Sequence, residues 1–412
     1  MTRTTEKPQG GFFARLVRKQ IFIPLAALLI LIVFNLIADP SFFAVTLKEN
    51  SLGDLVLTGN LITILDNASE LVILAIGMTL VTAASGGQDI SVGSAIAIAG
   101  SVVLRVLCGT NSRPDTLQAP IIVAFLACCV VSMLFGAFNG TLVAVFKIQP
   151  MVATLILYTA GRSIAAWINN NELPMISDPA FAYYGNFLPG VAVPTPIFIA
   201  VICMLLAWAL LRFTNIGLYS QAVGINASAA RLNGIHPQFV KFLTYVILGL
   251  CVAVAGFIKV SRFSTINYSV VAKDIEMDAI LAVAVGGNSY SANMLAINVK
   301  RTKFLAHLIC GILAGIGGFV YFLHVGSGSP SHASGAEMNA IASSIIGGTM
   351  LTGGVGNIIG TLFGVLSLST IKNIVSSLGL DEAWWTNITV AAMICLFLVI
   401  QSLVLSRKNR DE

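Results

Sequence analysis

The feature that most constrains this chain is a succession of long apolar blocks that carry almost no charge. They cover residues 21–38, 69–84, 90–108, 119–146, 151–168, 191–211, 239–260, 304–323, 356–376 and 384–404. A helix that crosses a bilayer needs about 20 predominantly apolar residues. The blocks are continuous, whereas the strands of a membrane β-barrel alternate between apolar and polar residues. The sequence therefore predicts an all-α polytopic membrane protein.

Composition excludes the other broad classes. Only 10% of the 412 residues are charged and 57% are hydrophobic, whereas a soluble domain carries about 25% charged residues. This excludes an ordinary soluble enzyme, a disordered chain and a protein that binds nucleic acid. Residues 21–38 follow Arg15, Arg18 and Lys19 without a small-residue cleavage site, so we expect a retained first span.

Two shorter apolar blocks, 277–287 and 338–350, are bounded by pairs of glycines. Such segments are typical of partial crossings or broken helices, which protein or a water-filled cavity must surround. With them the chain has about 10–12 transmembrane segments, some short or broken. If the N-terminus is cytoplasmic and every block crosses, 15 of the 23 Lys and Arg residues lie inside. The positive-inside rule therefore predicts that both termini are cytoplasmic.

The chain contains an internal repeat within what we predict to be a single membrane domain, residues 1–412. Residues 222–257 align with 284–319 at 13 identical positions of 36. Glu276-Met-Asp-Ala-Ile then matches Glu337-Met-Asn-Ala-Ile. The copies, 222–287 and 284–348, have the same predicted orientation, so the repeat is parallel. Each copy is expected to hold an inner loop, a full span, an outer loop and a short returning segment.

The motif Ser85-Gly-Gly-Gln-Asp-Ile-Ser-Val-Gly93 separates two apolar blocks. A lone carboxylate is expensive in lipid, so Asp89 should lie inside the bundle or at the start of a helix. One interpretation is that Asp89 and Ser91 cap the following helix. The other is that Gln88, Asp89 and Ser91 line a solute path, and both can hold. Further candidates for this path are polar and aromatic residues within spans: Asn139, Tyr158, Arg162, Trp167 and Asn169. Hydrogen bonds between helices are the alternative role for them, and Arg162 could extend to the outer interface.

A second motif lies in a basic inner loop, at Gly224-Ile-Asn-Ala-Ser-Ala-Ala-Arg-Leu-Asn-Gly-Ile235. As a short amphipathic helix it could dock a partner; a plain solvated loop is the alternative. The candidate docking residues are Asn226, Ala229, Ala230, Arg231 and Gly234, and those of the second copy are Asn288, Ser291 and Ala292.

Chemistry-bearing motifs are scarce. The sequence has no Gly-rich phosphate loop of the Walker type, and no nucleophile–base set can be assembled. The seven cysteines lie mostly within apolar blocks and the four histidines do not cluster. We therefore expect neither an enzyme nor a bound metal or cofactor in this chain.

Together, the Ser85–Gly93 motif, the loop 224–235 and Glu276-Met-Asp-Ala-Ile-Leu-Ala-Val-Ala-Val-Gly-Gly287 resemble the membrane subunits of bacterial ABC sugar importers of the ribose/arabinose/galactose/xylose type. Residues 147–157 and Ala160-Gly-Arg162 look especially like galactofuranose-type members. The resemblance implies a multi-pass permease in the inner membrane that moves a pentose or hexofuranose by alternating access. It also implies three partners besides lipid: an ATPase subunit docked on the loop 224–235, a periplasmic sugar-binding protein and a second permease.

The repeated loop departs from the family pattern, in which the loop and the Glu-x-Asp-Ala-Ile segment occur once. Residues 1–287 resemble one permease of a galactofuranose-type pair, and residues 284–412 look more like the other. We hypothesise a fusion of two paired permeases joined near 284–288. Two rival functions stay open at this stage. One is an ion-coupled secondary transporter, for which Asp89 is the one intramembrane candidate, and the other is an inactive fusion.

Overall fold

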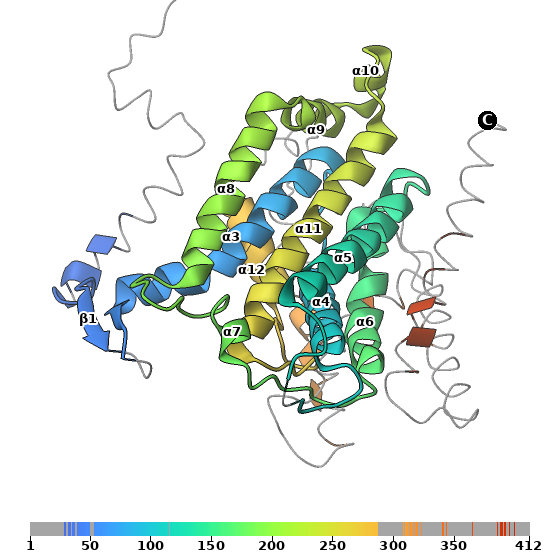
Figure 1. Ribbon diagram of the computed structural model, residues 1–412. Coiled ribbons are helices and arrows are strands. Elements are labelled where there is room, and N and C mark those ends of the chain that lie inside the picture. Colours follow the sequence, from blue (N-terminus) through green and yellow to red (C-terminus); the bar gives the residue numbers. More distant parts are fainter. Residues whose placement is uncertain are drawn as a thin grey trace, which may run out of the picture.

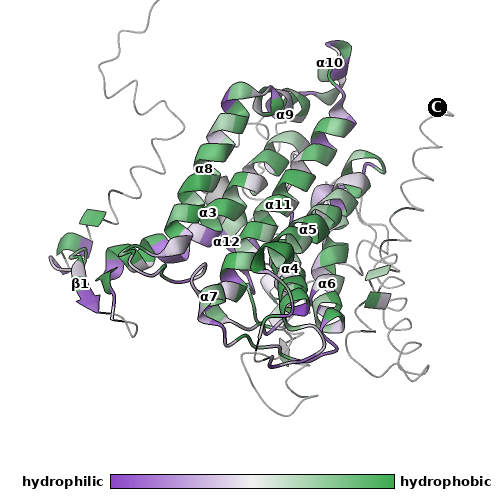
Figure 2. Cartoon of the chain, viewed as in Figure 1, coloured by the Kyte–Doolittle hydropathy of each residue, from purple (hydrophilic) through white to green (hydrophobic). Residues whose placement is uncertain are grey.

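A computed structural model describes residues 39–49, 53–114 and 116–286, together with isolated residues before and after them. Five described helices are long and apolar enough to cross a membrane. They are α3 (Asn60–Ser85), α5 (Ile121–Ala144), α6 (Pro150–Ile168), α8 (Thr195–Phe213) and α11 (Pro237–Phe263). This confirms the predicted helical, polytopic membrane class. Figure 2 shows hydrophobic residues along the length of these helices and hydrophilic ones near their ends.

Helix α11 lies at the centre of the bundle and packs against α5, α3 and α4 (Val92–Cys108) (Figure 1). Glycines allow the closest of these contacts. A Cβ atom on Gly136 of α5 would stand 2.3 Å from the carbonyl oxygen of Tyr245, and one on Gly249 of α11 would stand 2.4 Å from that of Ser132. Small residues let helix backbones approach closely in lipid, so the backbones of α5 and α11 are in close contact at these two glycines.

Helix α4 is shorter than the spans but more completely enclosed. Every residue from Val92 to Ser101 is buried, and α4 packs against α5, α6 and α11. It begins after the break at residues 86–91, where Gly86 ends α3 in the left-handed region at φ 70°. The predicted block 90–108 is therefore a helix in the interior of the bundle.

A two-stranded hairpin precedes the first described span, in the segment between the apolar blocks 21–38 and 69–84. Strands β1 (Thr46–Glu49) and β2 (Leu55–Thr58) pair antiparallel, with Thr46 opposite Thr58. Helix α3 then begins at Asn60, nine residues before its apolar block at 69. This first part of α3 is joined to α11 by the ion pair between Asp66 and Arg262, described below.

The two ends of the bundle differ in charge. We call the end that carries Lys147, Arg212, Arg231 and Lys241 the basic end. The loops at the opposite end carry Glu172 and Asp178, close to Asp66 on α3, and we call it the acidic end. Hydrogen bonds join its loops, including the backbone N–H of Met175 to the carbonyl of Ser112 and that of Ile176 to the carbonyl of Ser264. The four cations of the basic end belong to the 15 Lys and Arg residues that the predicted topology places inside.

The first copy of the predicted repeat, residues 222–287, falls on described elements up to residue 286. Two short helices, α9 (Ile216–Ile225) and α10 (Ala227–Leu232), precede the span α11. The irregular segment 264–274 and the short helix α12 (Ile275–Gly286) follow it. A short helix α7 (Pro179–Ala182) lies in the acidic-end loop 169–194. The second copy, the block 338–350 as a whole and both predicted cytoplasmic termini lie outside the described residues.

Candidate functional site

The loop 224–235 is a helix–bend–helix at the basic end. Asn226 is the bend: its backbone is extended, and its side-chain oxygen accepts a hydrogen bond of 3.0 Å from the N–H of Ala229, which caps α10. At the other end of α10, Asn233 donates to the carbonyl of Ala229 at 2.9 Å, and Gly234 takes a left-handed φ of 79°. The predicted residues Asn226 and Gly234 therefore shape the loop.

The side chains of the loop divide into an inward and an outward set. Ala230 is only 5% exposed and packs with Ala84, Val223 and Val240. Ala229 and Arg231 are exposed. Ile225 and Leu232 are 86% and 89% exposed, and we did not single them out from the sequence. The sequence could have indicated their exposure, because apolar residues in a polar loop at the end of a span have no core in which to be buried.

Gly224 joins this loop to α3. A Cβ atom at Gly224 would lie 1.8 Å from the carbonyl oxygen of Ala83, which is far closer than a non-bonded carbon and oxygen can approach. The backbone of α9 thus touches the last turn of α3, directly before the break at residues 86–91. A displacement of the loop must act on the end of α3 through this contact.

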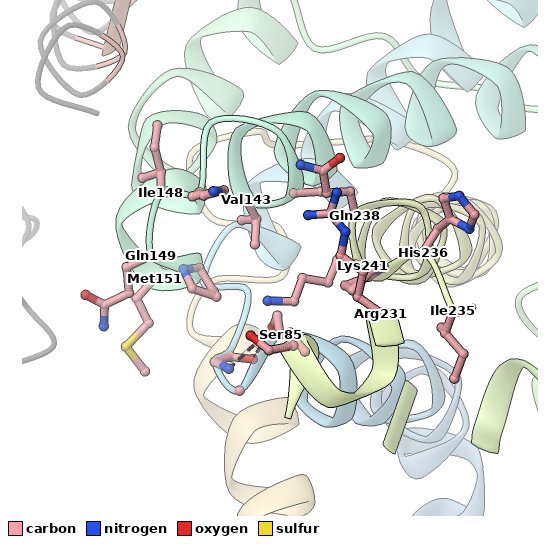
Figure 3. Close-up of a pocket in the computed structure, with 18 of the residues that line it drawn as sticks. Ser85, Val143, Ile148, Gln149, Met151, Arg231, Ile235, His236, Gln238 and Lys241 are labelled. Atoms are coloured by element: carbon pink, nitrogen blue, oxygen red, sulfur yellow. Dashed lines mark hydrogen bonds between the residues drawn. The ribbon is translucent and has the colours of Figure 1, made fainter. Parts of the chain in front are cut away.

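A cavity of about 920 Å³ opens between the loop and the bundle. We call it the basic cavity. Its walls are the end of α3 at residues 85–87, the turn 147–151 between α5 and α6, and residues 227–241. Figure 3 shows Ile148, Gln149 and Met151 on one side and Arg231, His236 and Lys241 on the other. Three cations line it, Lys147, Arg231 and Lys241. Among the described residues, no Asp or Glu lines it and no ion pair is formed by these cations.

The predicted residues Asp89, Ser91 and Asn139 meet in the interior. One carboxylate oxygen of Asp89 accepts from the N–H and hydroxyl of Ser91, at 2.7 and 2.6 Å. The other accepts from the Asn139 amide at 3.2 Å, and that amide also donates to the Ser91 hydroxyl at 3.0 Å. Asp89 therefore stabilises the turn before α4 rather than bonding an N–H group of the helix itself. The neighbouring cavity is about 10 Å³, the space of roughly one water molecule.

The other predicted path residues lie elsewhere. Gln88 is half-buried in the break, and Tyr158 is half-buried on α6 and packs against the core. Trp167 is 55% exposed near the end of α6. The Asn169 amide donates to the carbonyl of Ser101 at 3.4 Å, which joins the end of α6 to the middle of α4. The structure therefore brings three of the eight candidate path residues, Asp89, Ser91 and Asn139, into one hydrogen-bonded cluster.

Arg162 has a role that neither sequence interpretation gave it. From the middle of α6 it donates to the carbonyl oxygens of Tyr268 and Val271, at 2.9 and 2.8 Å. Irregular backbone inside a membrane protein needs partners for its polar groups, and Arg162 supplies them for the segment 264–274. Tyr268 in turn donates its hydroxyl to the carbonyl of Glu172, and burial raises the pKa of this tyrosine.

An ion-pair network near the acidic end was not predicted. Glu70 pairs with Lys259 at 2.8 Å, and Asp66 pairs with Arg262 at 3.0 Å. Glu70 is only 3% exposed. The signal for this network was the spacing: acids at i and i+4 share one face of α3, and cations at i and i+3 share one face of α11.

Comparison with known proteins identifies the family. The model of the family described as "Branched-chain amino acid transport system / permease component" matches residues 60–290 and 283–398. The chain belongs to this family. The two matched segments overlap at residues 283–290, within which the predicted junction 284–288 falls. No solved structure matches the chain.

Individual relatives of this permease are sugar permeases. The Galactofuranose transporter permease protein YtfT of Escherichia coli (strain K12) is 38% identical over 294 residues, covering 70% of this chain and 80% of the relative. The Fructose import permease protein FruF of Bifidobacterium longum (strain NCC 2705) is 32% identical over 70% of this chain and 79% of its own. The Ribose import permease protein RbsC of Escherichia coli (strain K12) is 28% identical over 92% of both chains. These matches confirm the predicted resemblance to ABC sugar permeases.

Proposed function

We propose that this chain is the membrane-spanning subunit of an ABC importer that carries a monosaccharide across the inner membrane. The substrate class, a pentose or a hexofuranose, follows from the relatives, which are named for galactofuranose, ribose and fructose. The partners we propose are a separate ATPase subunit, a periplasmic sugar-binding protein and a second permease. Energy from ATP enters through protein contacts, and the chain itself performs no covalent chemistry.

The observation that carries this proposal is the contact between Gly224 and Ala83. It joins an outward-facing loop to the end of a spanning helix at the place where that helix breaks. A partner bound to the loop can therefore move the end of α3. That end leads directly into residues 86–91, where the Asp89 cluster ties the break to Asn139 of α5. Movement of the loop would thereby be passed to the break and, through the Asp89 cluster, to α5. Alternating access takes place by rigid-body movements of this kind.

The docking surface we propose combines Ile225 and Leu232 with the basic cavity beside them. Burial of exposed apolar side chains such as Ile225 and Leu232 stabilises an interface, and unpaired cations favour a partner with acidic side chains. Among the predicted docking residues, Ala229 is exposed on the loop and Arg231 lines the basic cavity, so both fit this role. Asn226 and Gly234 would act by shaping the loop, and Ala230 by packing beneath it.

Reconstitution tests the proposal. The purified permease is placed in proteoliposomes with its ATPase and sugar-binding protein, and ATP hydrolysis is measured with and without sugar. We expect stimulation by the transported sugar, and accumulation of labelled sugar that depends on ATP. Uptake that persists without the ATPase and collapses with an uncoupler would instead establish an ion-coupled transporter.

The fusion hypothesis remains our proposal for the origin of the second loop copy. The overlap of the two family segments at residues 283–290 supports it. Sequencing of the genomic locus tests it: two complete, adjacent permease genes would identify the chain as a recombined product, and one uninterrupted gene would contradict that origin. An inactive fusion predicts no sugar-stimulated ATP hydrolysis in the reconstituted complex.

A further inference from the structure

A second cavity, of about 640 Å³, lies near the acidic end between α3, the end of α11 and the segment 265–278. We call it the paired-charge cavity. Its volume is in the range of pockets that hold small molecules. Its polar wall includes Asn67, Glu70, Lys259, Arg262 and Asn267. The ring of Phe263, which is exposed, forms part of its apolar wall.

The cavity is lined by charges of both signs, Glu70 and Asp278 on one hand and Lys259, Arg262 and Lys273 on the other, and those on α3 and α11 form ion pairs. Glu70 binds Lys259 through Oε2 at 2.8 Å, and Arg262 binds Asp66 at 3.0 Å and the side-chain oxygen of Asn67 at 3.2 Å. A ligand with a net charge would therefore find its own charge opposed by one member of each pair. A neutral ligand that both donates and accepts hydrogen bonds meets no such conflict.

The network nevertheless leaves hydrogen-bonding capacity unused. Glu70 Oε1 is buried and accepts no hydrogen bond within the described residues; its nearest cation, Arg262, lies at 3.5 Å. The buried Nε of Arg262 likewise has no hydrogen-bond acceptor among them. A buried polar atom without a partner is costly, so a ligand that supplies hydroxyl groups here would be stabilised.

We infer that the paired-charge cavity binds a neutral, ring-form sugar. One hydroxyl donates to Glu70 Oε1, others bond to Lys259 and the amide of Asn67, and an apolar face of the ring packs on Phe263. This inference rests on the proposed function for its substrate class. It adds a second site, distinct from the Asp89 cluster, at the end of the bundle opposite the docking loop.

The place of this cavity suits a sugar that arrives from the periplasm. Val270 and Val271 line the cavity, and the carbonyl oxygen of Val271 is one of the two that Arg162 holds from α6. A sugar bound here therefore touches the same irregular segment that leads into α12. Occupancy can thus affect the position of this segment within the bundle.

Protection from chemical modification tests the site. Asn267 is exposed on the cavity wall, so Asn267→Cys is labelled in membranes with a membrane-impermeant maleimide, with and without D-ribose, D-fructose or methyl galactofuranoside. We expect at least one neutral sugar to slow labelling several-fold and in a saturable way. The control is Leu173→Cys, exposed near the same end but outside the cavity, whose labelling should not change. The unsubstituted chain supplies the background from native cysteines.

Two further variants connect the protection to the named groups. In the Asn267→Cys background, Glu70→Gln keeps the side-chain size but removes the charged acceptor, and we expect the half-protecting sugar concentration to rise about tenfold. Phe263→Leu should raise it as well while keeping an apolar wall. An unchanged labelling rate without sugar, together with a monodisperse elution profile, shows that each variant is folded.

The outcomes separate this inference from the proposed function. A reconstituted complex that transports sugar while Asn267→Cys is never protected would overturn the inference alone. Protection by ribose 5-phosphate but by no neutral sugar would also overturn it, because it would show an anion site. Protection by neutral sugars in a protein that never stimulates its ATPase would support the site and contradict the importer.

Discussion

The two cavities of this permease use charged side chains in opposite ways. In the basic cavity, Lys147, Arg231 and Lys241 have no acidic counterpart among the lining residues that the structure describes. In the paired-charge cavity, Lys259 and Arg262 are matched by Glu70 and Asp66. An unmatched set attracts a partner of opposite charge, whereas a matched set holds two helices together and leaves neutral hydrogen-bonding groups for a ligand. The comparison teaches that a similar number of cations can serve docking at one end and structure at the other.

The largest effect on stability is expected when an ion pair of the paired-charge cavity is broken. Glu70→Leu leaves Lys259 without its 2.8 Å partner and Arg262 with fewer neighbours. Loss of one member of a buried pair costs about 3 kcal/mol of folding free energy, measured here by thermal unfolding in detergent. The double variant Glu70→Leu/Lys259→Leu removes both members and should recover most of the loss. A double variant as unstable as the single one would show that the pair does not hold α3 to α11.

The next effect concerns the contact between the loop and α3. Gly224→Ala places a methyl group against a backbone carbonyl, so α9 must move away from Ala83. We expect a large loss of sugar-stimulated ATP hydrolysis in proteoliposomes, with protein yield reduced less. Gly217→Ala on the same helix is the matched control, because its added methyl meets only the flexible end of Leu211. Equal activity of the two variants would refute the role of the Gly224 contact.

A smaller and more local effect is expected from the docking loop. Leu232→Asp changes a side chain that is 89% exposed, so the chain should insert and fold normally. Loss of an interface anchor costs about 2 kcal/mol, or roughly 30-fold in affinity, measured by titration of the ATPase onto the reconstituted permease. Ala230→Asp provides the contrast: it buries an unpaired carboxylate among Ala84, Val223 and Val240, and should lower yield before it affects docking. Full ATPase affinity in Leu232→Asp would place docking elsewhere, for example on the second loop copy.

The smallest effect on stability is expected for a substitution among the cations of the basic cavity. Lys241→Leu leaves no acidic partner unpaired among the described residues, so the unfolding free energy should change by no more than about 0.5 kcal/mol. ATPase binding should nevertheless weaken, and its dependence on salt should decrease, because one screened attraction is gone. A loss of stability as large as that of Glu70→Leu would show that Lys241 has a structural counter-ion and would erase the distinction between the two cavities.

Sequence reasoning was effective where the property in question is local. Apolar length identified the spans, and the short block 277–287 was expected as a returning segment and is found as α12. It was less effective for the direction of side chains. Ala230 was proposed as a docking residue, yet it is buried beneath the loop, while Leu232 is the exposed neighbour. A six-residue helix offers too few positions for periodicity to decide which face is covered.

The sequence by itself determined the membrane class, the segregation of charge between two ends, and the family, because each depends on composition and order along the chain. The tertiary structure alone decided which polar groups meet. Glu70 and Lys259 are far apart in sequence, as are Asp89 and Asn139, and Arg162 meets carbonyl groups about a hundred residues away. The physical reason is helix rotation. A spanning helix such as α5 is apolar on all sides, so its sequence does not say which face turns inward, and only close packing at points such as Gly136 and Gly249 fixes that angle.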